Sequence, residues 1–173
     1  ALRKIARRTW LFFEELFTPL DHWLIPDNYQ KDRADVVAHR TSPTNIGLQL
    51  LSTLAAYDFG YISASGVVDR LEPTFATLLK LHRYRGHFYN WYDTRTFVPL
   101  VPTYVSAVDS GNLAGYLLAT RAGLLQLCND PVIAGRALDG VRDAVQLCEE
   151  CLARAPKTTT AQPAGMLKRE FVA

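Results

Sequence analysis

Two segments of this sequence, 46–59 and 111–128, carry apolar residues around most of the circumference of a predicted helix. A helix with so little polar surface must be covered on several sides. Three other segments, 2–17, 63–85 and 131–154, have one apolar stripe and one polar face, which predicts helices that are covered on one side only. The order outer, inner, outer, inner, outer therefore predicts an all-α fold of antiparallel helical hairpins.

Capping and breaking residues set the expected helix boundaries. Either Thr41 or Ser42 is placed to cap the first inner helix, and Pro43 suits its first turn because a missing N–H costs nothing there. The second inner helix is expected to be capped by Asp109 or Ser110, and the last helix by Asp130 with Pro131. Because Pro73 falls inside the predicted helix over 63–85, we expect a kink or a break near Glu72.

Composition and charge exclude several classes of protein. The net charge is only +2, and the basic residues are scattered apart from a cluster at positions 3–8, so no concentrated nucleic-acid-binding face is expected. The apolar runs are too short to cross a bilayer, and no secretory signal is apparent. The three cysteines, Cys128, Cys148 and Cys151, form an odd set on helical segments, which favours a reducing compartment.

The segment His87–Thr96 has the most unusual composition in the chain, because four aromatic rings alternate with amides, a carboxylate and a guanidinium. Aromatic faces stack on the apolar face of a sugar ring, while amide, carboxylate and guanidinium groups bond its hydroxyls. The same segment could instead be a structural loop that closes the end of a helical bundle. The composition alone leaves both alternatives open.

Long irregular segments precede both inner helices, and the connections that follow these helices are short. In a toroid of helical hairpins, this order places the long segments on one rim. We therefore expect residues 27–28, 41–45, 89–94 and 109–112 to converge.

Three motifs resemble the cyclic β-1,2-glucan synthase family. They are Arg-Thr-Ser-Pro-Thr-Asn-Ile-Gly at 40–47, His-Phe-Tyr-Asn-Trp-Tyr-Asp-Thr at 87–94 and Val-Asp-Ser-Gly-Asn-Leu-Ala-Gly at 108–115. Their order and spacing resemble the family from Arg8 to about Leu127. The resemblance is to the glucoamylase-like region of that family, which lies between a membrane-bound glycosyltransferase part and a phosphorylase-like part.

The resemblance implies an (α/α)6 toroid that acts on β-1,2-glucan and closes it into a ring by transglycosylation, at the cytoplasmic side of a bacterial inner membrane. About five helices are too few for that toroid, so residues 1–155 are expected to be an incomplete domain of a larger enzyme, with 156–173 as a flexible tail. The glutamates expected to catalyse the reaction have no counterpart here. No catalytic residue, cofactor or metal site is therefore predicted, and the chain itself is expected to be soluble and inactive alone.

The predicted partner is a β-1,2-glucan chain, together with the remaining domains of the parent synthase. Asp93 and Asp109 are the best carboxylates for chemistry, but Asp109 serves equally well as a helix cap, and Asp93 could hold Arg95 or a loop amide. Asn45 and Asn112, in the first turns of the two inner helices, could instead bond local backbone. The residues predicted to contact sugar are Asp27, Asn28, Arg40, Thr44, Asn45, Tyr89, Asn90, Trp91, Tyr92, Asp93, Asp109, Ser110 and Asn112.

A second hypothesis is a helical protein–protein interaction scaffold in which the aromatic segment is structural. Burial of Trp91 and Tyr92 among leucines would favour this hypothesis, whereas convergence on one concave rim would favour sugar binding. Because an incomplete toroid leaves apolar helix faces without partners, we also expect a homo-oligomer that buries surface from residues 46–55 or 113–125.

Overall fold

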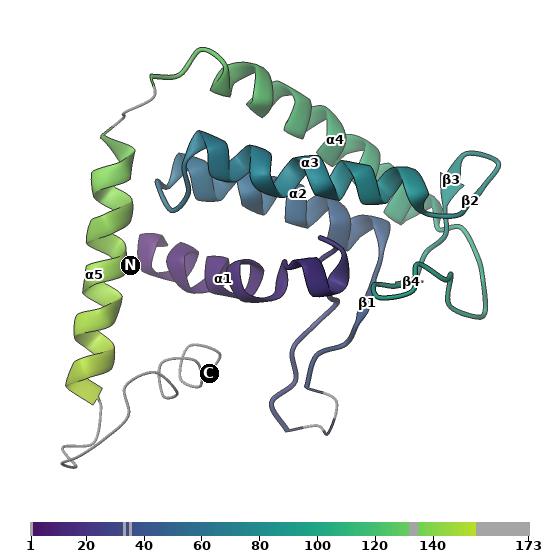
Figure 1. Ribbon diagram of the computed structural model, residues 1–173, viewed down its shortest axis with the longest axis horizontal. Helices are drawn as coiled ribbons and strands as arrows, with labels where there is room; N and C mark the ends of the chain where they lie inside the picture. The colour runs from purple at the N-terminus through teal and green to yellow at the C-terminus, as the bar shows by residue number, and fades with distance from the viewer. Residues whose placement is uncertain (1, 33, 35, 132–134, 155–173) are drawn as a thin grey trace.

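The computed structural model describes residues 2–32, 34, 36–131 and 135–154. Within these residues the fold is all-α, as predicted, and consists of five helices joined by long loops (Figure 1). The helices are α1 (Leu2–Leu16), α2 (Pro43–Asp58), α3 (Ala64–Lys80), α4 (Ala107–Leu127) and α5 (Arg136–Arg154), with a short 3-10 helix, η1 (Pro19–Asp21).

Four two-residue strands lie in the loops near the start of α2. They are β1 (Arg40–Thr41), β2 (Arg83–Tyr84), β3 (His87–Phe88) and β4 (Tyr92–Asp93). Strands β2 and β3 form a hairpin, whereas β1 pairs antiparallel with β4, so that Arg40 lies opposite Asp93 and Thr41 lies opposite Tyr92. The pairing of β1 with β4 joins the irregular segment before α2 to the aromatic segment that follows α3.

Helix α2 is the central helix of the bundle. It makes its most extensive contact with α4 and also contacts α3 and α1 (Figure 1). Ser42 caps it, because the backbone N–H of Asn45 donates to the Ser42 hydroxyl, and Pro43 occupies the first turn. The prediction that this segment forms an inner helix is confirmed. Its buried residues are Pro43, Ile46, Gly47, Gln49, Leu50, Thr53, Ala56 and Tyr57.

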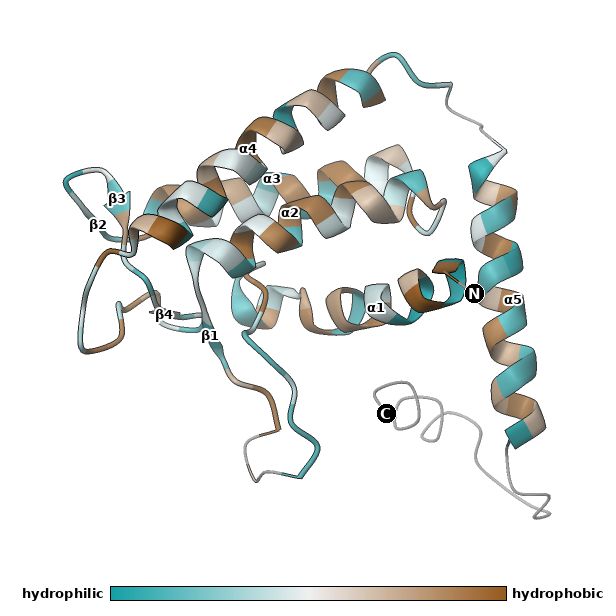
Figure 2. Cartoon of the chain, turned by 180° about the vertical axis from the view of Figure 1, so that it is seen from behind, coloured by the Kyte–Doolittle hydropathy of each residue, from teal (hydrophilic) through white to brown (hydrophobic). Residues whose placement is uncertain are grey.

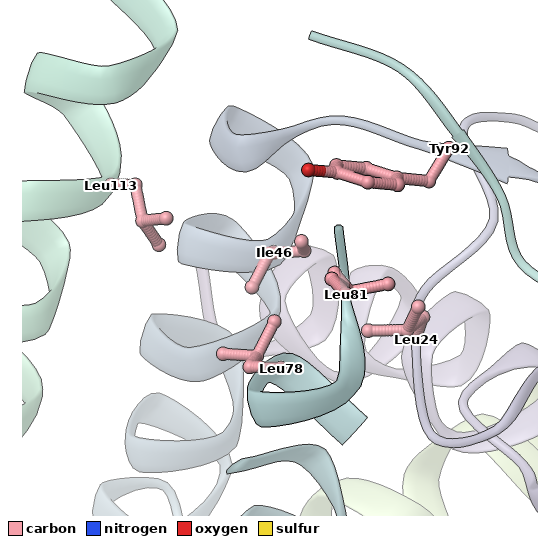
Figure 3. Close-up of a cluster of buried hydrophobic side chains, with 6 residues drawn as sticks. All are labelled: Leu24, Ile46, Leu78, Leu81, Tyr92 and Leu113. Carbon is pink, nitrogen blue, oxygen red and sulfur yellow. The ribbon is translucent and has the colours of Figure 1, made fainter. Parts of the chain in front are cut away.

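Six buried side chains from α2, α3, α4 and the neighbouring non-helical segments form one core cluster at the end where α2 begins (Figure 3). The cluster brings together a loop, three helices and the strand β4. This cluster lies beneath the loops at that end and supports the segments that carry the polar side chains. Its members are Leu24, Ile46, Leu78, Leu81, Tyr92 and Leu113.

Helix α4 departs from the predicted inner position. Only Leu113 and Thr120 are buried on it, while Leu118 is 72% exposed and Leu125 is 53% exposed. Figure 2 shows apolar residues along this helix at the edge of the bundle. One face of α4 packs on α2, and its other face has no covering helix among the described residues.

Several predicted helix boundaries were wrong. Helix α3 is continuous through Pro73 and ends at Lys80. The hairpin β2–β3, which begins at Arg83, takes the place of the further helix expected up to Arg85. No break is needed because Asp69, whose carbonyl loses its helical donor at Pro73, is exposed and can be hydrated.

Helix α5 begins at Arg136, and Asp130 pairs with the Arg136 guanidinium at 2.9 Å instead of capping the helix. The predicted flexible tail, 156–173, lies outside the described residues, as do positions 132–134 of the predicted last helix.

Helix α5 crosses the end of the bundle beside the N-terminus of α1 (Figure 1). Helix α5 also packs closely against the turn after α2, where Gly140 faces Gly60. A Cβ on Gly140 would lie 2.0 Å from the Gly60 carbonyl oxygen, so this approach requires glycine. Asp143 accepts hydrogen bonds from Arg3 at 2.9 Å and from the Tyr61 hydroxyl at 3.1 Å. Burial and the hydrogen bond to Asp143 raise the pKa of Tyr61 to about 12.

Of the two segments predicted to form an oligomer interface, 46–55 and 113–125, only the second keeps an exposed apolar face. Segment 46–55 is largely buried within the chain itself, with only Leu48 substantially exposed, so it is not available as an interface. Segment 113–125 keeps the exposed face of α4, and homo-oligomerisation through that face stays a prediction. In the described part of the chain, no helix combines the length and the apolar character required to cross a membrane.

The close packing of α2 on α4 predicts a matched pair of substitutions. Gly47→Ala places a Cβ 2.0 Å from the Tyr116 ring, whereas Gly115→Ala on α4 meets nothing within 4 Å. We expect Gly47→Ala to lower the free energy of unfolding by about 1–3 kcal/mol through overpacking. Gly115→Ala should leave it unchanged or raise it by up to about 1 kcal/mol, because alanine favours the helix. Urea unfolding of both variants checks this, and equal stabilities would contradict the packing.

Candidate functional site

The predicted convergence of four chain segments is present in the structure, at the end of the bundle where α2 and α4 begin (Figure 1). Two hydrogen bonds join the first turn of α2 to the other segments. The Asn45 amide donates to Asp27 at 3.0 Å, and the Thr44 hydroxyl donates to Asp109 at 2.6 Å. We call the connected set of Asp27, Arg40, Thr44, Asn45, Asn90, Trp91, Asp109 and Asn112 the rim network.

Asp27 is the hub of one side of the rim network. Its carboxylate accepts from the Arg40 guanidinium at 3.0 and 3.2 Å, from the Asn28 amide at 2.9 Å and from the Asn45 amide. The two contacts with the guanidinium fix its orientation as well as its position. Arg40 and Asn45 are therefore held in place by one half-buried carboxylate.

Asp109 is the hub of the other side, and its structural role differs from the predicted one. The cap of α4 is Ser106, whose hydroxyl accepts from the backbone N–H of Asp109 at 3.1 Å. Asp109 itself lies in the first turn, where a negative charge is favoured by the helix dipole. Its carboxylate accepts from Thr44, and the Thr44 hydroxyl accepts in turn from the Asn112 amide at 3.1 Å.

Ser110 does not reach this surface. Its hydroxyl oxygen is buried and has no hydrogen-bond partner in the part of the chain that the structure describes. Ser110 does not cap α4, because Ser106, one turn earlier, is the cap. The Ser110 hydroxyl is buried, so a ligand at this surface cannot reach it.

Asn90 connects Trp91 to Asp109. The Asn90 side chain is 6% exposed. With its amide nitrogen towards Asp109, it donates to the carboxylate at 2.9 Å, and its oxygen accepts from the Trp91 indole N–H at 2.9 Å and from the Tyr104 hydroxyl at 2.8 Å. In this orientation both the nitrogen and the oxygen of the buried Asn90 amide have hydrogen-bond partners.

Trp91 is the aromatic residue of the rim network and is half-buried. Besides the hydrogen bond at its indole nitrogen, its ring lies 4.9 Å from the guanidinium carbon of Arg40, a cation–π contact. Because Asp27 fixes Arg40 and Asn90 fixes the indole N–H, the ring is held in one orientation before any ligand arrives.

Tyr92 was predicted to stack on sugar, and the structure places it elsewhere. Its side chain is 0% exposed and belongs to the core cluster, where its hydroxyl donates to the His82 carbonyl at 2.6 Å and accepts from the Tyr89 N–H at 2.7 Å. Burial raises the pKa of Tyr92 to about 12. Tyr89 and Phe88 are half-buried against the same cluster, so alternation along this irregular segment does not separate ligand-facing from core-facing rings.

Asp93 shapes the turn after β4. Its carboxylate accepts from the backbone N–H groups of Arg95 at 2.9 Å and Thr96 at 2.8 Å, which is one of the alternatives that the sequence left open. Burial alone would raise the pKa of Asp93, but these N–H groups and the Arg95 guanidinium outweigh it and hold the pKa below its usual value.

A second polar cluster, which the sequence did not indicate, lies beside the rim network. The buried Asp21 carboxylate accepts from His39 Nδ1 at 2.7 Å and from the Thr94 hydroxyl. His39 Nε2 in turn lies 2.7 Å from the Arg95 guanidinium, so the His39 ring bridges Asp21 and Arg95. No spacing in the sequence pairs these residues, which are brought together only by tertiary folding.

A cleft of about 970 Å³ opens next to this cluster. The extended segments around 28–30 and 36–40 form one wall of the cleft. The turn after β4 forms the opposite wall. We call it the side cleft and define it by Asn28, Gln30, His39, Arg40, Asp93 and Arg95.

The chemistry that these groups can support is binding and orientation. The carboxylates of Asp27, Asp93 and Asp109 each accept hydrogen bonds from protein groups, and no glutamate belongs to the rim network or the side cleft. Among the described residues, no group of three or more His, Cys, Asp or Glu side chains is arranged to hold a metal ion.

Comparison with known sequences identifies a related protein. Over 99% of its length, the chain is 44% identical to the cyclic β-(1,2)-glucan synthase NdvB of Rhizobium meliloti strain 1021, and it spans 6% of that protein. No family model matches the chain. The resemblance indicated by the three sequence motifs is thereby confirmed.

Solved structures share the fold. A candidate glucoamylase from Bacteroides fragilis NCTC 9343 superposes with a TM-score of 0.59 at 20% identity, over 72% of this chain and 33% of that one. The endo-β-1,2-glucanase of Chitinophaga pinensis, solved with sophorotriose and glucose, gives a TM-score of 0.58 at 18% identity, over 71% and 34%. The helical hairpins therefore form part of an (α/α)6 toroid, and the chain spans about a third of each of these proteins.

The lowered pKa of Asp93 predicts a pH-dependent contribution to stability. A carboxylate whose pKa is depressed by folding stabilises the native state above the pKa of the unfolded chain, about 3.9, and this contribution disappears as the pH falls through the folded value. We expect the Asp93→Asn variant to have a lower free energy of unfolding than the wild type at pH 7. Below about pH 4 the two free energies should become similar. Urea unfolding across this range measures both proteins, and a difference that does not change with pH would contradict the assignment.

Proposed function

We propose that this chain is a segment of a cyclic β-1,2-glucan synthase and that it forms the sugar-binding wall of the glucoamylase-like, ring-closing region of such an enzyme. The observation that carries the proposal is the fixed orientation of Trp91 beside amides and carboxylates of the rim network. An immobilised ring flanked by hydrogen-bonding groups is an arrangement that binds a pyranose, because the ring stacks on an apolar face of the sugar and the polar groups bond its hydroxyls.

The residues have distinct roles in this proposal. Trp91 stacks on one sugar ring, while Asn45, Asn112 and Arg40 bond its hydroxyls. Asp27 and Asp109 hold these groups. Among the described residues, Asp109 accepts only from Thr44 and Asn90, so it can also accept from sugar hydroxyls, since a carboxylate has about four acceptor positions. Tyr89 lines the same wall, and Asn90 acts through Trp91 because its own side chain is buried.

Catalysis is assigned to other parts of the parent enzyme. Glycoside transfer needs two carboxyl groups across the scissile bond, and the aspartates of the rim network already accept hydrogen bonds from protein groups. We therefore propose that residues 1–155 belong to an incomplete domain that is inactive alone, within a membrane-bound parent that acts on β-1,2-glucan. The exposed apolar face of α4 would then be covered by later helices of the toroid.

Two observations favour the alternative of a helical interaction scaffold. Tyr92 is buried among leucines, and α4 exposes Leu118 and Leu125 on its uncovered face. In that case, the aromatic segment is structural and the ligand is another protein segment or a second copy of the chain.

The proposal predicts a specific response to linear β-1,2-gluco-oligosaccharides. In a titration followed by the indole NMR signals of the three tryptophans, the Trp91 signal should shift and saturate, while Trp10, which is buried, should not move. We expect Asn112→Ala to weaken binding by about tenfold, through the loss of a polar contact of the kind worth about 1.5 kcal/mol. Asn129→Ala, at the far end of α4, is the matched control and should bind like the wild type.

Saturable binding that is insensitive to Asn112→Ala would reject the assigned wall, and the absence of any response at Trp91 would reject preformed sugar binding by this chain.

The scaffold alternative predicts a different outcome. Leu118→Asp with Leu125→Asp should abolish self-association of the chain in sedimentation at high concentration, because both side chains lie on the exposed face of α4. A wild-type chain that sediments as a clean monomer at every concentration would contradict self-association through this face.

A further inference from the structure

The side cleft is a candidate binding site separate from the position of the Trp91 ring. Its volume of about 970 Å³ lies within the range of sites for small organic ligands. Its walls combine the polar groups of Asn28, Gln30 and Arg95 with the small apolar residues Val36 and Ala38. A mixture of this kind suits a ligand that has both hydroxyl groups and apolar C–H surface.

Several polar side chains of the side cleft are already held in place by other protein groups. Asn28 and Arg40 are held by Asp27, His39 is held between Asp21 and Arg95, and Asp93 is held by two backbone N–H groups. Pre-oriented groups bind a ligand at a lower entropic cost than free side chains do. Asn28, His39 and Arg40 would therefore meet a ligand in fixed orientations.

Charge indicates the class of ligand. Arg40 is neutralised by Asp27, and the carboxylate of Asp93 lies opposite Arg40 on the paired strand. An anionic ligand would approach these carboxylates as well as the guanidinium groups. The described residues therefore favour a neutral ligand rich in hydroxyls over a phosphate or a carboxylate.

Arg40 connects the side cleft to the rim network. Arg40 lines the cleft, and its guanidinium lies over the Trp91 ring. A sugar chain with one unit stacked on Trp91 can therefore continue past Arg40 without leaving the protein surface.

We propose that the side cleft is a second sugar subsite, which takes the units of a glucan chain beyond the unit at Trp91. This inference rests on the proposed function, because it assumes that a glucan binds at Trp91. It adds Gln30, His39 and Arg95 to the residues that contact the chain, and it makes the length of the oligosaccharide the determinant of affinity.

The test compares a β-1,2-linked glucose disaccharide with the linear hexasaccharide, both titrated calorimetrically into this chain. We expect the wild type to bind the hexasaccharide at least about tenfold more tightly, because further polar contacts are made in the cleft. Arg95→Gln and Gln30→Ala should each remove most of that advantage and leave disaccharide affinity within twofold. Arg121→Gln, an exposed arginine on α4, is the matched control for the loss of charge.

The outcomes separate the two proposals. Equal affinity of the wild type for both sugars, or a length advantage that survives Arg95→Gln and Gln30→Ala, would overturn the side cleft as a subsite while leaving Trp91 binding intact. Failure of the wild type to bind either sugar would reject the proposed function and this inference with it. Circular dichroism of each variant confirms that a loss of binding does not reflect unfolding.

Discussion

The hydrogen bonds made by Thr44 and Asn45 hold the functional end of this molecule together. Asn45 reaches Asp27 in the irregular segment before α2, and Thr44 reaches Asp109 in the first turn of α4. Both side chains occupy these positions because Ser42 caps α2 and Pro43 fixes its first turn. A short capping sequence therefore determines where two distant segments meet and, through Asn90 and Arg40, how Trp91 is oriented.

The parts of the fold that depend on local patterns could be predicted from the sequence. The apolar circumference of α2 predicted a buried helix, and the cap at Ser42 predicted its start within one residue. The convergence of Asp27, Thr44, Asn45 and Asp109 followed from the placement of long loops before apolar helices. These features were accessible because they rest on periodicity and capping, which are properties of contiguous residues.

The parts of the fold that depend on tertiary contacts could not be predicted from the sequence. Tyr92 is buried because the pairing of β1 with β4 turns its ring towards Leu24 and Leu81, and no periodicity in an irregular segment shows this orientation. The contact of His39 with Asp21 and Arg95 joins η1, the segment before β1 and the turn after β4, whose positions in the sequence have no common spacing. The apolar pattern of α4 indicated burial, but nothing in the described part of the chain covers its outer face.

The central claim is that these segments form a preformed sugar-binding wall around Trp91. Its most direct test is a crystal structure of the chain soaked with a linear β-1,2-gluco-oligosaccharide. We expect a glucose ring stacked on Trp91, with hydroxyls within hydrogen-bond distance of Asn45 or Asn112 and with the rim network unchanged. Sugar bound at another surface, or a rim network that must rearrange before it binds, would contradict the claim.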